Sequence, residues 1–160
     1  MNPSDLQVSD EWQDAVRRAD ALAETVRARG GDLDPAFEAL EQEIRRFEAS
    51  GLPVDVLVPS GGEAGLGFSL RRQQSGRSFW SVYAEALQGQ LCDENGELRK
   101  LSNQAVAPGV ATILATIMTT LALPLAALPV LVPVAVILAT TGIDAFCRWS
   151  SGPTDEPIGG

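Results

Sequence analysis

Carboxylates are the only abundant side chains in this sequence that could act as general acids or bases. The chain of 160 residues has 21 Asp and Glu residues, 12 Lys and Arg residues and no histidine. Without histidine, neither a Ser-His-Asp nor a Cys-His nucleophilic site can form. Glu38, Glu41 and Glu48 recur at the spacing of a solvated helix surface, opposite Phe37. We therefore expect no enzyme activity, and we infer no catalytic residue, cofactor, metal site or small-molecule substrate.

The two cysteines, Cys92 and Cys147, are too few for a disulfide framework or a zinc site made of thiolates. We expect two reduced thiols in a cytosolic protein, although one bridge remains open. The first residues, MNPSDLQVSDEW, lack the basic and then apolar pattern of a secretory signal peptide. These observations predict that the N-terminal part stays in the cytoplasm.

The charge pattern argues against nucleic acid as a partner. The formal net charge is −9, and no basic cluster is larger than a pair such as Arg45-Arg46. Binding to a phosphate backbone needs several cations on one face. We therefore expect a protein or a membrane as the partner.

The N-terminal third predicts two amphipathic helices, at residues 9–29 and 35–49. Ser9 or Asp10 can cap the first helix, Gly30-Gly31 stops it, and Asp34-Pro35 has the cap and first-turn pattern of the second. The short connection predicts an antiparallel hairpin. Its apolar stripes form a possible partner face: Trp12, Val16, Phe37, Leu40, Ile44 and Phe47. They could equally pack on their own domain or on a third element.

The middle of the chain predicts two short strands and a further helix. Residues 54–58 and 66–70 alternate between apolar and other residues, and a Pro-Ser-Gly-Gly link joins them. Residues 78–91 place Phe79 or Trp80, Tyr83, Leu87 and Leu91 on one helical face. The expected fold class is therefore α+β and mostly helical, with a short two-stranded β element between two helical hairpins.

An uncharged run of 39 residues, 105–143, dominates the C-terminal third. It is about twice the length of roughly 20 residues that one membrane-spanning helix needs. Because an interior proline breaks a helix, the prolines divide the run into two helices, about 109–123 and 133–146, joined by the apolar linker PLAALPVLV. Each helix would be roughly 20 Å long, against a hydrocarbon thickness of about 30 Å.

The composition of this hairpin suits close helix packing, in lipid or in protein. We assign to it the following small residues and prolines: Ala107, Ala111, Ala115, Thr119, Pro124, Pro129, Pro133, Ala135, Ala139 and Gly142. Arg99 and Lys100 before it, and Arg148 and Trp149 after it, have the positions of membrane-flanking residues. We divide the chain into a flexible start (1–8), a small acidic α+β domain (9–104), the hydrophobic hairpin (105–149) and a disordered tail (150–160).

Two functions follow from the two ways of covering the hairpin. In the first, the protein is a non-enzymatic, oligomerising membrane effector in which a cytoplasmic domain anchors or controls a hairpin in the inner membrane. Its architecture is similar to that of small bacterial membrane effectors. In the second, the protein is a soluble interaction or assembly subunit that buries the hairpin in its own core, or in a homo- or hetero-oligomer. We favour the first, because 96 residues are few to surround two apolar helices.

Overall fold

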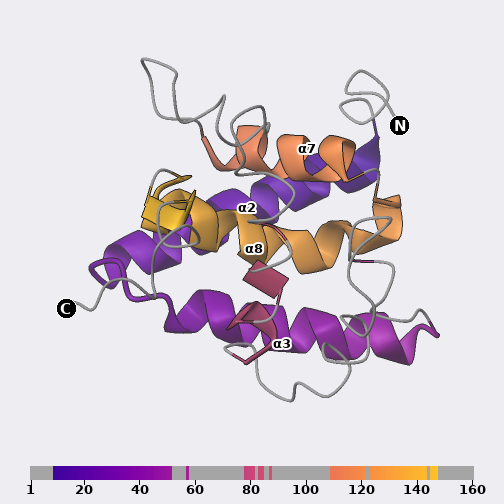
Figure 1. Ribbon diagram of the computed structural model, residues 1–160, viewed down its shortest axis with the longest axis horizontal. Helices are drawn as coiled ribbons and strands as arrows, with labels where there is room; N and C mark the ends of the chain where they lie inside the picture. The colour runs from indigo at the N-terminus through magenta and orange to yellow at the C-terminus, as the bar shows by residue number, and fades with distance from the viewer. Residues whose placement is uncertain are drawn as a thin grey trace.

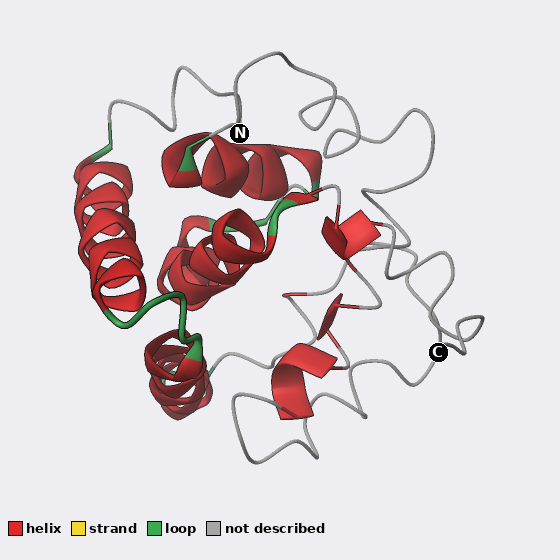
Figure 2. Ribbon diagram, turned by 90° about the vertical axis from the view of Figure 1, so that its left-hand side faces the viewer, coloured by secondary structure: helices red, strands yellow, loops and turns green. Residues whose placement is uncertain are grey.

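The computed structural model describes residues 9–51, 57, 78–81, 83–84, 87, 109–121, 123–143 and 145–147. These residues form a helical bundle around one central helix, α8 (Leu128–Thr141). Helices α2 (Asp10–Ala28) and α3 (Asp34–Ala49) lie on two sides of α8, and α7 (Val110–Thr120) lies against both α2 and α8 (Figure 1). The view turned by 90° shows helices and no strand in this part of the chain (Figure 2).

Helix α2 forms as its sequence predicts. The Ser9 side chain accepts a hydrogen bond from the Trp12 amide at 3.0 Å, and two acidic residues in the first turn complement the positive helix end. The helix ends where Gly30 and Gly31 adopt φ values of 70° and 90°. These left-handed conformations suit glycine, and the Gly31 amide donates to the Val26 carbonyl at 2.9 Å.

Helix α3 confirms the predicted second amphipathic helix but differs at its cap. The N-cap position is Leu33, which makes no side-chain cap, and the Asp32 side chain accepts a hydrogen bond from the Asp34 amide at 3.0 Å. Pro35 lies in the first turn, where no amide donor is needed. The chain reverses between α2 and α3, and both helices contact α8 more extensively than each other (Figure 1). The third element that the stripes face is therefore α8.

Helix α8 begins earlier than the sequence predicts. Residues that we expected in the apolar linker form a short 3-10 helix, η2 (Leu125–Ala127), followed directly by the first turn of α8. Pro129 fits this first turn, and Pro133 lies inside the helix rather than at its start. A proline near the start of a helix removes one interior hydrogen bond, and burial of the surrounding apolar residues outweighs that loss.

The apolar surface of α8 is covered on all sides. Each residue from 130 to 138 is buried, and α8 has no acidic or basic residue in its first or last turn. A helix that is apolar all round must be buried in protein or in lipid. Here α2, α3 and α7 supply the cover, and their buried side chains belong to the same hydrophobic core as those of α8. The segments 9–104 and 105–149 therefore share a core in the described residues.

The aromatic segment 78–87 also packs on this core. Its described residues are helical, as predicted, and Phe79, Tyr83, Ala84 and Leu87 are buried. The Phe79 and Tyr83 ring centroids lie 5.4 Å apart, and Trp80 contacts Phe146 with centroids 5.8 Å apart. The contact with Phe146 joins the middle of the chain to the end of the hairpin.

The two strands were expected at 54–58 and 66–70, and all of these residues except Leu57 lie outside the described residues; Leu57 is in a 3-10 conformation. The reduced-thiol prediction is wrong for Cys147, which is buried and disulfide-bonded. The only other cysteine of the sequence, Cys92, lies outside the described residues.

Candidate interaction site

The predicted partner face lies mostly inside the bundle. Trp12, Leu40, Ile44 and Phe47 are buried, while the remaining two residues, Val16 and Phe37, are partly buried against the same core. The apolar stripes of α2 and α3 therefore pack on a third element, α8, which was the alternative to a free partner face. The surface open to a partner must therefore be sought elsewhere on α2 and α3.

The predicted hairpin residues divide between the core and the surface. Pro133 and Ala135 are buried in α8; Pro129, Ala111, Ala115, Thr119 and Gly142 are partly exposed; and Pro124 and Ala139 are exposed. The remaining predicted residues, Ala107, Arg99, Lys100, Arg148 and Trp149, lie outside the described residues. The described members of this set therefore range from buried to exposed.

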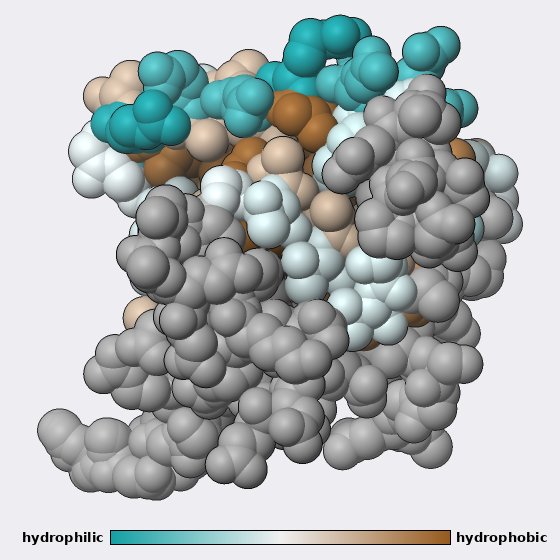
Figure 3. Space-filling view, turned by 90° about the horizontal axis from the view of Figure 1, so that it is seen from above, coloured by the Kyte–Doolittle hydropathy of each residue, from teal (hydrophilic) through white to brown (hydrophobic). Residues whose placement is uncertain are grey.

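The outward side of α7 carries only alanine and threonine. Thr112 and Thr120 are exposed, and the Thr116 and Thr119 hydroxyls donate to the carbonyls of Thr112 and Ala115, each at 2.8 Å. In Figure 3, which views the molecule from the side of α7, a pale to tan area adjoins a teal, hydrophilic one. Helix α7 spans about 16 Å and α8 about 21 Å at 1.5 Å per residue. Within the described residues, every helix is too short or too polar to cross a membrane.

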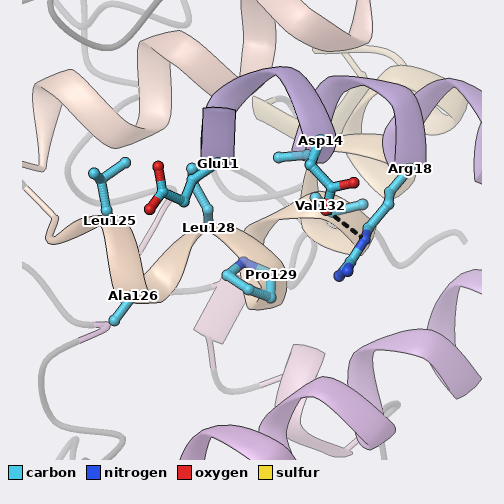
Figure 4. Close-up of a pocket in the computed structure, with 9 residues that line it drawn as sticks. Glu11, Asp14, Arg18, Leu125, Ala126, Leu128, Pro129 and Val132 are labelled. Atoms are coloured by element: carbon cyan, nitrogen blue, oxygen red, sulfur yellow. Dashed lines mark ion pairs between the residues drawn. The ribbon is translucent and has the colours of Figure 1, made fainter. Parts of the chain in front are cut away.

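Two adjoining cavities lie along η2 and the first turns of α8, the first against α2 and the second between α2 and α3. The first has a volume of about 280 Å³ and is lined by Glu11, Asp14, Ala15, Arg18, Leu125, Ala126, Leu128, Pro129 and Val132 (Figure 4). The second has a volume of about 390 Å³ and is lined by Arg18, Glu43, Arg46, Phe47, Ser50, Ala126, Pro129 and Val130. Because they share Arg18, Ala126 and Pro129, we treat them as one site, the α2–α3 groove.

The floor of the α2–α3 groove is apolar and partly open to solvent. Ala126 is exposed, while Leu125 and Pro129 are partly exposed. These residues belong to η2, which Pro124 precedes, and to the first turn of α8, which contains Pro129. The prolines fix the backbone where the chain turns from α7 into α8, so they hold this apolar floor between the two charged walls.

The walls of the groove carry charged side chains that are mostly paired within one helix. On α2, the Arg18 Nε lies 3.0 Å from the Asp14 Oδ2, and Arg17 approaches the same carboxylate at 3.5 Å. On α3, Arg46 pairs with Glu43 at 2.9 Å. No described cation pairs with Glu11, whose side chain lies near Leu125 and Leu128 at the η2 end of the first cavity (Figure 4).

The groove combines an apolar floor with charged walls. Its titratable groups are exposed or paired at the surface, and none is a thiol, an imidazole or a lysine. Among the described residues, no three His, Cys, Asp or Glu side chains lie close enough to hold a metal ion. An apolar floor between polar walls is typical of surfaces that accept side chains of another protein.

The groove lies on residues that the sequence pattern predicts as a linker, PLAALPVLV. The predicted partner face instead comprised the apolar stripes of α2 and α3. The available signal was the sequence PLAALP at 124–129, which has a proline at each end and is too apolar for an ordinary solvent-exposed loop. Comparison with protein-family models, with curated proteins and with solved structures finds no match to this chain.

Proposed function

We propose that this chain is a non-enzymatic interaction or assembly protein that keeps its apolar hairpin in its own core and binds a protein partner at the α2–α3 groove. The observation that carries this proposal is the enclosure of α8 by α2, α3 and α7. Burial of one Val, Leu or Ile side chain contributes about 1.5–3 kcal/mol. Moving α8 into lipid would preserve its own burial but would expose the apolar sides of α2 and α3 to water.

The groove supports the interaction part of the proposal. It leaves Ala126 exposed and Leu125 and Pro129 partly exposed, although the α8 residues that follow, 130–138, are all buried. A partner that covered these residues would remove apolar surface from water without displacing any side chain of the core.

Site-specific photo-crosslinking in the host cell tests this function. A photoreactive amino acid replaces Ala126 in the groove or, as the control, Ala139, another exposed alanine of the same hairpin. We expect a discrete protein adduct from position 126 and none from position 139. Adducts of equal yield from both positions, or no protein adduct from either, would contradict the proposal.

Membrane association remains a second candidate, supported by the outward side of α7. That side has no charged residue, and its threonine hydroxyls at 116 and 119 are already bonded within the helix, so it could be covered by lipid at a small desolvation cost. Carbonate extraction of host membranes separates the two functions. Retention of the chain in the extracted membrane pellet supports insertion, whereas release into the supernatant supports the groove-binding protein.

A further inference from the structure

We infer that the α2–α3 groove accepts an amphipathic helix of a partner protein that places apolar side chains on η2 and one lysine or arginine beside Glu11. This inference rests on the proposed interaction function and adds the chemistry of the partner. Three features of the groove lead to it: its apolar floor, the Glu11 carboxylate at one end, with which no described cation pairs, and its division into two small cavities.

The apolar floor requires apolar side chains from the partner. Leu125, Ala126 and Pro129 offer no side-chain donor or acceptor. A polar group pressed against them would lose its hydrogen bonds to water without replacement. The partner must therefore present aliphatic or aromatic side chains at the centre of the contact.

The charges on the groove walls call for a basic group of the partner beside Glu11. Asp14 is shared by Arg17 and Arg18, and Glu43 is paired with Arg46, so these carboxylates already have partners. Glu11 is exposed, and no described cation neutralises it. A partner cation beside Glu11 would gain an ion pair, whereas a partner carboxylate there would meet a like charge.

The overall charge favours a basic protein segment over an anionic lipid surface. The chain has a net charge of −9, and the groove walls contain Glu11, Asp14 and Glu43 against Arg18 and Arg46. An anionic membrane would be repelled at long range, while a basic segment would be attracted.

The shape of the groove favours a helix over a bulky ligand. Cavities of about 280 and 390 Å³ lie at the lower limit of sites that enclose a drug-sized molecule, so each suits one or two side chains. The cavities adjoin and share Arg18, Ala126 and Pro129. Side chains three or four residues apart project from the same face of a helix and can enter neighbouring cavities.

Selection from a random peptide library against the full-length protein tests this inference. Selected peptides are labelled, and their affinities are measured by fluorescence anisotropy for the unchanged protein and for Glu11→Lys, Ala126→Arg and Glu38→Lys. Glu38 is an exposed carboxylate of α3 away from the groove, so Glu38→Lys has the same charge change as Glu11→Lys. Circular dichroism melting confirms that each variant is folded.

We expect selected peptides that combine apolar residues at helical spacing with lysine or arginine. Glu11→Lys should weaken binding about tenfold, equivalent to about 1.4 kcal/mol, and Glu38→Lys should change it less than twofold. Replacing the basic residue of the peptide by glutamate should restore binding to Glu11→Lys. Equal effects of the two lysine variants, or acidic selected peptides, would overturn the inference but not the groove function. Undiminished binding to the Ala126→Arg variant would overturn both the helix inference and the proposed groove function.

Discussion

At the scale of single residues, Tyr83 links two parts of the chain that are distant in sequence. Its hydroxyl donates to the Leu57 carbonyl at 2.7 Å in the buried core. Burial raises the pKa of the Tyr83 hydroxyl well above its usual value, because the ionised phenolate would lose its hydration. The sequence contains no other tyrosine, so this group has its own spectroscopic signal.

The first prediction concerns alkaline pH. Below about pH 10 the hydroxyl is protonated in both the folded and the unfolded chain, so it adds no pH dependence to stability. Above about pH 10 only the unfolded chain ionises, so the free energy of unfolding should fall by about 1.4 kcal/mol per pH unit. Tyrosinate absorbance should therefore rise together with the loss of helical circular dichroism. Ionisation of Tyr83 near pH 10 in a fully folded chain would contradict its burial.

The first prediction extends to replacement of Tyr83 by phenylalanine, which separates the hydrogen bond from the packing of the ring. Tyr83→Phe keeps the contact with Phe79 but leaves the Leu57 carbonyl without its donor. We expect a loss of about 1–3 kcal/mol in the free energy of unfolding at pH 7, measured by denaturant titration. The variant should also lack the tyrosinate signal. Unchanged stability would show that the hydrogen bond is not formed in solution.

The second prediction concerns Cys147. It is buried beside Phe146 at the end of the hairpin and is disulfide-bonded. When the protein is denatured without a reductant, iodoacetamide should leave Cys147 unmodified. When the protein is reduced before alkylation, Cys147 should become reactive. Peptide mapping under non-reducing conditions identifies the residue to which it is bonded. Alkylation of Cys147 without reductant would contradict the bridge.

At the scale of helices, α2 and α3 were predictable because their signals are local. The spacing of Trp12 and Val26, the cap at Ser9 and the stop at Gly30 all act within one or two helical turns. The start of α8 was not predictable in this way. Local rules place a helix boundary at Pro133, but burial on α2 and α3 favours continuation back to Leu128.

The third prediction uses two alanines one helical turn apart in α8. Ala135 is fully buried and Ala139 is exposed. Ala135→Asp should lower the free energy of unfolding by at least about 3 kcal/mol, because it leaves an uncompensated charge in the core. Ala139→Asp should change it by no more than about 0.5 kcal/mol, as for an ordinary surface substitution. Thermal unfolding monitored by circular dichroism checks both. Equal damage would indicate that Ala139 is also covered, by lipid or by a second chain.

At the scale of the whole molecule, the sequence alone could not decide what covers residues 105–143. Composition shows that the segment is apolar, but its cover depends on which other helices meet it, and that is set by contacts distant in sequence. The estimate that residues 9–104 are too few to surround both apolar helices assumed that both needed full enclosure. In the structure only α8 is enclosed, while α7 leaves its alanine and threonine side open.

The α2–α3 groove is also a property of the whole molecule. Glu11 and Ala126 are far apart in sequence and meet only because α8 lies between α2 and α3. The sequence indicated that a protein partner was possible, but it could not place the contact, since the apolar stripes that suggested it are used to cover α8.

Hydrogen exchange in purified, detergent-free protein tests the enclosure of α8 most directly. Amides in the buried centre of a bundle exchange only when the whole bundle opens, whereas amides of an exposed or lipid-covered helix lose protection without detergent. We predict that residues 134–138 exchange most slowly of all described residues, at the rate of global unfolding. Rapid exchange of α8 while α2 and α3 remain protected, or a chain that stays dispersed only in detergent, would contradict the account.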